Sequence, residues 1–249
     1  MAGVLEEVRC RAVALWKREG IWERSIDVTA RTLSTEEAIG NPEGDDFPLQ
    51  QGRERLMEAV FTVNGEARRG QAFTDRYGDF SATLGEIAAM PLENNFRRAI
   101  FVAALNAVMS ALGRAEGTVH CRDEAPTECA GLLADHFVER FGKVRVAQVG
   151  FQPAMVQALG KRTELRVLDL DEDNIGQVKR GCLIEGPQYA RDVLEWAEVL
   201  NVTGTTLVND TIDQFVSSAN GGKPVVFYGT TIAGAASLMG WDRFCARSS

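Results

Sequence analysis

Two strand-like segments in the second half of the chain end in the same tripeptide, and this repetition strongly constrains the fold. Residues 199–206 and 224–231 are each an apolar run that closes in Gly-Thr-Thr. In a parallel α/β sheet, such ends present backbone N–H groups and hydroxyls along the carboxyl edge of the strands, where open α/β sheets bind ligands. The repeat therefore predicts a polar, anion-tolerant crevice at one edge of a parallel sheet.

Apolar strands and helical patterns alternate through the whole second half. The apolar runs lie at residues 144–149, 165–168, 199–202 and 225–228, and a helix preceding the first of them opens at Ala125-Pro126. This alternation is typical of a doubly wound, mainly parallel sheet. We expect an α/β fold class, with a Rossmann-like domain over residues 117–249.

The first 116 residues show a different periodicity. Alternating runs flank Asn64-Gly65, and both residues tolerate the positive φ of a type I′ turn, so an antiparallel hairpin is predicted there. We expect residues 1–116 to form a smaller α+β domain. Its other expected elements are a helix at 4–19, a strand at 26–30, a loop at 41–48 and helices at 82–90 and 95–112.

The long helix at 95–112 carries a stripe of small residues. Ala99, Ala103, Asn106 and Ser110 are spaced three or four residues apart, so another backbone can approach this face closely. Asn106 is the polar member. Either its amide is buried and satisfied by a neighbouring backbone, or it points into a site between the two halves.

The turn after residue 149 resembles a dinucleotide-binding turn only in part. Gly150 follows a strand, and Asp169 lies 19 residues later, which is the spacing of a ribose-binding acid. Phe151 and Gln152 occupy positions where close approach to a pyrophosphate needs glycine, so an NAD-type dinucleotide is not expected. The residues expected to line the crevice are Asn106, Gly150, Gln152, Asp169, Gly204, Thr205, Thr206, Asn209, Gly229 and Thr230.

Those polar residues also have a purely structural interpretation. Threonine side chains often satisfy only the local backbone, and Asn209 or Asp210 is a suitable N-cap for a helix expected at about 209–219. The duplication of the Gly-Thr-Thr ends favours a binding crevice over this alternative.

Candidate metal ligands occur near the start of the second half. His120, Cys121, Cys129 and His136 fall within 17 residues. If 126–141 is one helix, however, Cys129 and His136 are about 10.5 Å apart along its axis, too far to share an ion. In a strand, His120 and Cys121 would point to opposite faces. A closed zinc site is therefore not expected; an open site remains, with candidate ligands His120, Cys121, Cys129 and Cys245. The alternative is that the cysteines are small buried hydrophobes.

Composition limits the classes of partner. The formal net charge of −8 argues against sequence-independent binding of nucleic acid, which depends on Lys and Arg. The sequence has no apolar stretch of the ~20 residues that a membrane span needs and no signal-peptide pattern. Five scattered cysteines fit free thiols in a reducing compartment. We expect a cytoplasmic protein whose partner is a metal ion or a small molecule; whether it forms a homo-oligomer is open.

Several of these segments, taken in order, resemble a known family. The segments are 118–121, 149–153, 168–171, 203–209 and 228–234, and they are similar to those of the family called domain of unknown function 364, which is associated with heavy-metal chelation. The resemblance covers roughly residues 90–249. It implies an enolase N-terminal-like first domain on a Rossmann-like domain, with a site at their junction.

Two hypotheses from different classes follow. The first is heavy-metal binding or chelation at the junction, through a transition-metal ion held by His120, Cys121, Cys129 or Cys245. The second is an enzyme or binding protein for a small anionic metabolite or nucleotide, held without metal by the glycine loops at the sheet edge. The sequence has two histidines and no serine in a nucleophile-elbow pattern, so whether any reaction is catalysed is left open.

Overall fold

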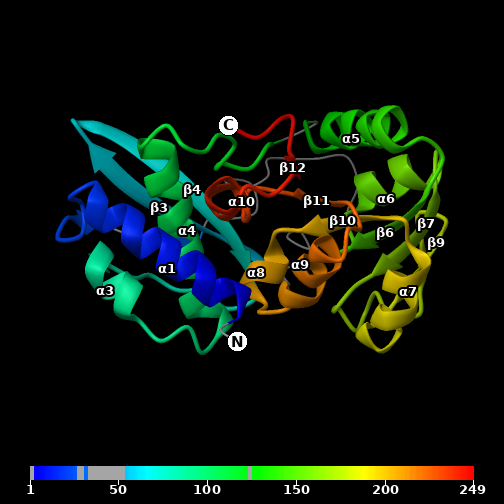
Figure 1. Ribbon diagram of the computed structural model, residues 1–249, viewed down its shortest axis with the longest axis horizontal. Coiled ribbons are helices and arrows are strands. Elements are labelled where there is room, and N and C mark those ends of the chain that lie inside the picture. Colours follow the sequence, from blue (N-terminus) through cyan, green and yellow to red (C-terminus); the bar gives the residue numbers. More distant parts are fainter. Residues whose placement is uncertain (1–2, 27–30, 33–53, 123–124) are drawn as a thin grey trace.

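The computed structural model describes residues 3–26, 31–32, 54–122 and 125–249. Figure 1 shows an antiparallel sheet with helices α1, α3 and α4 at one end of the molecule and a larger sheet with α5, α6 and α7 at the other. Helices α8, α9 and α10 lie between them. The helices of the first end are α1 (Val4–Arg18), α3 (Leu84–Ala89) and α4 (Asn95–Ala111).

The smaller sheet is built around the predicted hairpin. Strands β3 (Arg55–Val63) and β4 (Glu66–Thr74) pair antiparallel along their whole length, with Val63 opposite Glu66. Asn64 and Gly65 have φ of 53° and 82°, which are the values of a type I′ turn, so the hairpin prediction is confirmed. The neighbouring short strands are β1 (Ser25–Ile26), β2 (Arg31–Thr32) and β5 (Ala82–Thr83). Most of the strand predicted at 26–30, and the loop at 41–48, lie outside the described residues.

Helix α4 packs tightly against the hairpin through its stripe of small residues. A Cβ atom at Gly70 of β4 would lie 2.0 Å from the backbone nitrogen of Ala107 and 2.5 Å from the carbonyl oxygen of Ala103. The backbone of β4 therefore lies directly on the backbone of α4. The close approach expected for this helix face is present, and it depends on the absence of a side chain at position 70.

The larger sheet is mainly parallel, as predicted. All pairs within it are parallel except that between β8 and β9. The chain builds the sheet outward from β6 in one direction and then returns to build it from β10 in the other, so the β6–β10 boundary is a topological switch point. The spatial order of its strands is β12 (Arg243–Phe244), β11 (Val225–Tyr228), β10 (Val199–Thr203), β6 (Arg145–Val149), β7 (Glu164–Leu168), β9 (Cys182–Glu185) and β8 (Val178–Lys179).

Helices cover both faces of this sheet. On one face, Phe137 of α5 (Ala125–Phe141) and Leu159 of α6 (Pro153–Gly160) pack over Val146 and Val226. On the other face, Ala147 and Val202 belong to a core that continues without interruption through α4 to Trp16 of α1. The two predicted domains thus share one hydrophobic core. The remaining helices are η1 (Pro187–Tyr189), α7 (Ala190–Trp196), α8 (Thr205–Val208), α9 (Asp213–Asn220) and α10 (Ala233–Met239).

One helix differs from the sequence-based expectation. The pattern predicted a helix from about residue 209, but α9 begins at Asp213, and residues 205–208 form the separate short helix α8. Asp210 has a φ of 60°, which is incompatible with continuing a right-handed helix. Asn209 is therefore not the N-cap of α9 and is free to face the sheet edge. None of the described helices is both long and apolar enough to cross a membrane.

The contact between β4 and α4 predicts a severe effect of a single methyl group. Gly70→Ala places its Cβ against backbone atoms that cannot move independently, so we expect a loss of more than about 3 kcal/mol in the free energy of unfolding. Gly131→Ala in α5 is the matched control: nothing lies within 4 Å of the added Cβ, and the better helix propensity of alanine should stabilise by up to about 1 kcal/mol. Denaturant unfolding measures both. An equal, small effect of the two substitutions would contradict the packing.

Candidate functional site

A cavity of about 850 Å³ opens at the carboxyl edge of the parallel sheet. It lies over the switch point, where Gly150 follows β6 and Thr203 ends β10. A Cβ at Gly150 would meet the Thr203 methyl group at 2.8 Å and the Tyr228 hydroxyl at 3.0 Å. Gly150 also has a φ of 89°. The turn thus requires glycine because the ends of β6 and β10 lie side by side there. The reason is not that a pyrophosphate must approach the backbone.

Most of the predicted crevice residues line this one cavity. The two exceptions are Asn106 and Thr230, which are both fully buried and do not line the cavity. The predicted residues that line it are Gly150, Gln152, Asp169, Gly204, Thr205, Thr206, Asn209 and Gly229, together with His120, Cys121, Cys129 and Cys245.

The Asn106 amide is buried and hydrogen-bonded to backbone groups, and it does not point into the cavity. Its amide nitrogen donates to the carbonyl oxygen of Gln71 at 2.8 Å and lies within 3.0 and 3.1 Å of those of Thr230 and Thr231. Its carbonyl oxygen accepts the Gly234 N–H at 2.7 Å. Both ends of the amide are thus hydrogen-bonded to backbone groups. The residue of α4 that lines the cavity is Asn95, in the first helical turn, whose amide contacts Asp75 and Asn209.

A buried polar network supports the cavity floor. Gln148 of β6 accepts a hydrogen bond from the Asn201 amide at 2.5 Å and donates to the Tyr228 hydroxyl at 2.8 Å. Tyr228 lines the cavity, and burial raises the pKa of its phenol, which therefore stays protonated at neutral pH. These bonds cross β10, β6 and β11, so they fix the relative positions of the strand ends.

Asp169 holds the loop after β6 in place. Its carboxylate accepts the Phe151 N–H at 2.5 Å and the Asp171 N–H at 2.7 Å. Burial nevertheless raises the pKa of Asp169, against the effect of those hydrogen bonds. This acid is therefore largely engaged by backbone, where a dinucleotide-binding protein would use it for a ribose.

One wall of the cavity is acidic. Burial, followed by the negative charges of Asp169, Asp75 and Asp171, raises the pKa of Glu54 to about 7. All four residues line the cavity. Because neighbouring negative charges raise the pKa of Glu54, this part of the cavity favours a proton or a bound cation.

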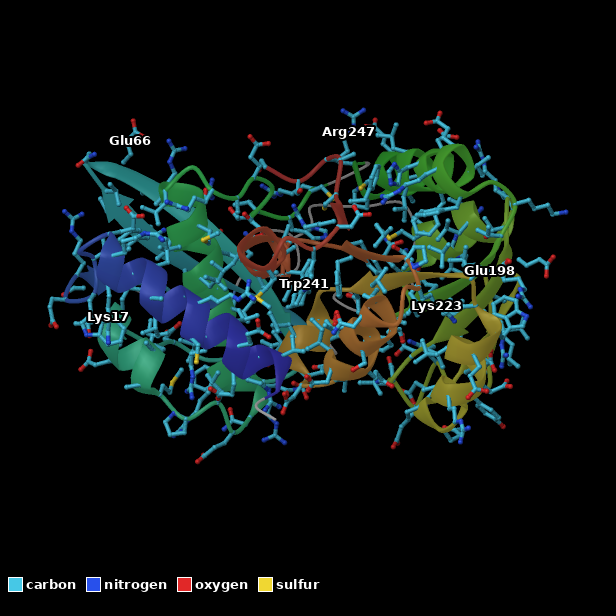
Figure 2. All side chains as sticks on the ribbon, in the orientation of Figure 1. Lys17, Glu66, Glu198, Lys223, Trp241 and Arg247 are labelled. Atoms are coloured by element: carbon cyan, nitrogen blue, oxygen red, sulfur yellow. The ribbon has the colours of Figure 1, made fainter. Side chains whose placement is uncertain are left out.

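The cavity lining also includes three cysteines from separate parts of the chain. Cys121 lies after α4, Cys129 on α5, and Cys245 directly after β12. The Cys129 thiol donates a hydrogen bond to the Cys245 sulfur. Arg247, which Figure 2 labels beside the C-terminal segment, pairs with Glu128 of α5 at 3.1 Å, so the segment carrying Cys245 is held along the start of that helix.

The pKa values of the Cys129 and Cys245 thiols are shifted in opposite directions. The hydrogen bond from Cys129, the positive charge of Arg243 and bonds from Ser248 and the Gly229 backbone lower the pKa of Cys245 to about 6, despite its burial. The same hydrogen bond, then burial, raises the pKa of Cys129. Burial raises the pKa of Cys121 to about 12. Cys245 is therefore the thiolate of the group at neutral pH.

His120 and Cys121 share the cavity wall, contrary to the strand geometry considered from the sequence. Residues 118–121 belong to no strand, and the His120 ring turns back so that Nδ1 lies 2.5 Å from the Cys121 carbonyl oxygen. A carbonyl accepts only, so Nδ1 carries the proton and Nε2 keeps a lone pair. Burial lowers the pKa of His120 to about 4. The ring is thus neutral, as a metal ligand must be.

The remaining candidates are less favourable for metal binding. His136 does not line the cavity; its ring stacks on Phe244 with centroids 4.8 Å apart. Within residues 3–26, 31–32, 54–122 and 125–249, no three His, Cys, Asp or Glu side chains are arranged to hold a metal ion together. The described part of the site therefore offers a pair of thiols with nearby groups, and not a closed cage.

Sequence reasoning missed several lining residues. Glu54 and Asp75 lie at the start and just beyond the end of the hairpin, and only the packing of that hairpin on α4 brings them to the sheet edge. Tyr228 is the residue immediately before the second Gly-Thr-Thr, so its position offered a signal; Glu54 offered none. The missed residues of the cavity wall include Glu54, Phe73, Asp75, Asn95, Thr203 and Tyr228.

One family model matches the part of the chain that forms the sheet and its carboxyl edge. The family model DUF364, described as "putative heavy-metal chelation", matches residues 132–239. The match spans α5 to α10 and includes both Gly-Thr-Thr ends. The family resemblance expected from the sequence is thus confirmed over this segment. No curated protein matches the chain significantly.

Two solved structures from the DUF364 family resemble the chain. A protein of unknown function from Pyrococcus horikoshii is 17% identical with a TM-score of 0.57, over 92% of this chain and 79% of that one. A second protein of unknown function, from Desulfitobacterium hafniense, is 11% identical with a TM-score of 0.49, over 92% and 84% of the two chains. The first similarity supports the fold.

The contact between Cys129 and Cys245 predicts an unusual pH profile of alkylation. Iodoacetamide reacts with thiolates, so the rate at Cys245 should rise through a midpoint near pH 6 and be flat by pH 8, as measured by mass spectrometry of the derived peptides. Cys129→Ala removes the main cause of the lowered pKa and should move the midpoint to higher pH. A wild-type rate that still climbs steeply above pH 7 would contradict the arrangement.

Proposed function

We propose that this protein binds a soft or borderline heavy-metal ion in the cavity at the carboxyl edge of the parallel sheet. The ion would be held by the Cys129–Cys245 pair; Cys121 and His120 line the same cavity. The supporting observation is that three cysteines from distant parts of the chain line one cavity, two of them hydrogen-bonded to each other. Thiolate and imidazole donors select zinc, copper, cobalt or nickel over magnesium and calcium.

The charge of the cavity favours this proposal over an anionic metabolite. Among the described residues that line it, six are Asp or Glu and none is Lys or Arg. Phosphate groups are usually recognised by such basic side chains, and here they would meet carboxylates instead. The matching family model is described as putative heavy-metal chelation, which also supports a metal ion as the ligand.

A cobalt titration tests the proposal. Co(II) added to metal-free protein should produce thiolate-to-metal charge-transfer absorption. Cys245→Ser and Cys129→Ser should each weaken the apparent affinity for Co(II) at least about tenfold, because the bound form needs deprotonated sulfur ligands. His120→Ala and Cys121→Ser should have smaller effects.

Cys10→Ser and Cys182→Ser are the matched controls, because neither cysteine lines the cavity, and both should bind as the wild type does. If all variants bind Co(II) equally weakly, and a phosphate-bearing metabolite instead raises the melting temperature, the metal proposal is wrong and the metabolite alternative is supported.

A further inference from the structure

Two thiols in the cavity touch each other although they lie far apart in the sequence. The sulfur atoms of Cys129 and Cys245 are in hydrogen-bonding contact, and both residues line the cavity. The S–S distance in a disulfide is about 2.05 Å, so two sulfur atoms that already share a hydrogen bond need only a short further approach to be joined. The pair can therefore be converted from two thiols into one disulfide.

The two thiols differ in their access to the cavity and in their surroundings. Cys129 is buried, whereas Cys245 is half-buried, so a small oxidant that enters the cavity reaches Cys245 first. The Arg243 guanidinium and the Gly229 backbone also form hydrogen bonds with the Cys245 sulfur. These groups stabilise negative charge on that sulfur, and the thiolate is the form that acts as a nucleophile. Cys245 is thus the attacking member of the pair.

The segment that carries Cys245 can adjust without disturbing the core. It follows the two-residue strand β12, and residues 245–249 belong to no helix or strand. It lies along the start of α5 (Figure 1), where Arg247 pairs with Glu128 at 3.1 Å. Closing a disulfide therefore requires a shift of a short surface segment toward a helix that stays in place.

We propose that Cys129 and Cys245 form a reversible disulfide when a hydroperoxide enters the cavity, with Cys245 as the attacking sulfur and Cys129 as the resolving sulfur. The reaction itself needs no metal. Its consequence for metal binding rests on the proposed function: the disulfide removes both sulfur donors, so oxidation releases a bound heavy-metal ion, and reduction by a small thiol restores the site.

The reaction has two steps. The Cys245 thiolate attacks one oxygen of the peroxide, so that an S–O bond forms, the O–O bond breaks, and the other oxygen leaves as water or an alcohol with a proton from the solvent. The Cys129 sulfur then attacks the Cys245 sulfenic acid; an S–S bond forms, the S–O bond breaks, and the hydroxyl leaves as water with the Cys129 proton. Two electrons pass from the sulfur atoms to the peroxide.

Peptide mapping of metal-free protein treated with hydrogen peroxide tests the proposal. Arg122 separates Cys121 from Cys129, and Cys245 lies between Arg243 and Arg247, so trypsin places the three cysteines of the cavity in three different peptides. The wild type should yield a disulfide between the Cys129 and Cys245 peptides while the other cysteines remain reduced, and dithiothreitol should reverse it.

Three substitutions test the order of the steps. Cys129→Ser should stop the reaction at the Cys245 sulfenic acid, which dimedone should trap in at least about tenfold higher yield than in the wild type. Cys245→Ser should slow oxidation of Cys129 at least about tenfold, because the attacking thiolate is gone. Cys121→Ser is the matched control: Cys121 lines the same cavity, and its variant should form the disulfide as the wild type does.

The wild-type map alone can contradict the proposal. If peroxide joins Cys245 to Cys121, or oxidises Cys245 without forming any disulfide, the inference is wrong. Oxidation of Cys129 at an undiminished rate in Cys245→Ser would also overturn it.

Zinc separates this inference from the proposed function. Bound Zn(II) should slow formation of the disulfide, and peroxide should release the ion in proportion to the disulfide formed, as measured with a chromogenic zinc chelator. If the disulfide forms in metal-free protein but Zn(II) neither binds nor slows it, the proposed function is wrong and the redox inference stands. If Zn(II) binds through Cys245 but peroxide gives no disulfide in metal-free protein, the redox inference is wrong and metal binding stands.

Discussion

The buried amide of Asn106 is the interaction on which the arrangement of the two sheets depends. It joins the carbonyl oxygen of Gln71 in the hairpin, the backbone of Thr230 and Thr231 after β11, and the N–H of Gly234 at the start of α10. Each buried backbone group left unpaired would cost about 1–3 kcal/mol, so a docking of α4 that left these groups unpaired would be less stable. The hydrophobic core that runs from α1 to the parallel sheet supplies most of the attraction, whereas Asn106 selects one position.

That position explains why the cavity has two chemically different walls. The hairpin and the first turn of α4 bring Glu54, Asp75 and Asn95 to the sheet edge. The far side is closed by α5 and the C-terminal segment, which Arg243 ties to the Gly117 carbonyl at 2.7 Å and to the Gly229 carbonyl at 2.9 Å. The sheet supplies the floor and, through the loop after β7, Asp169 and Asp171. A ligand in this cavity therefore contacts segments from both halves of the chain, and binding would stabilise their packing.

Local signals predicted the fold well because they depend on short stretches of chain. The Asn64-Gly65 hairpin and the parallel sheet are confirmed, and the two Gly-Thr-Thr ends do lie on adjacent strands at one edge. Asn106 shows the limit: helical spacing identified its face, but not which backbone would meet it. The contact between Cys129 and Cys245 depends on where the C-terminal segment returns, and Glu54 reaches the cavity only through hairpin packing, so neither has a local signal.

The central claim is that the thiols on the cavity wall are the metal ligands, and X-ray absorption spectroscopy of zinc-loaded protein tests it most directly. The account predicts at least two sulfur scatterers in the first shell, at the ~2.3 Å typical of zinc–thiolate bonds, and their loss in Cys245→Ser. A first shell of only nitrogen and oxygen scatterers at ~2.0–2.2 Å, unchanged by that substitution, would contradict it.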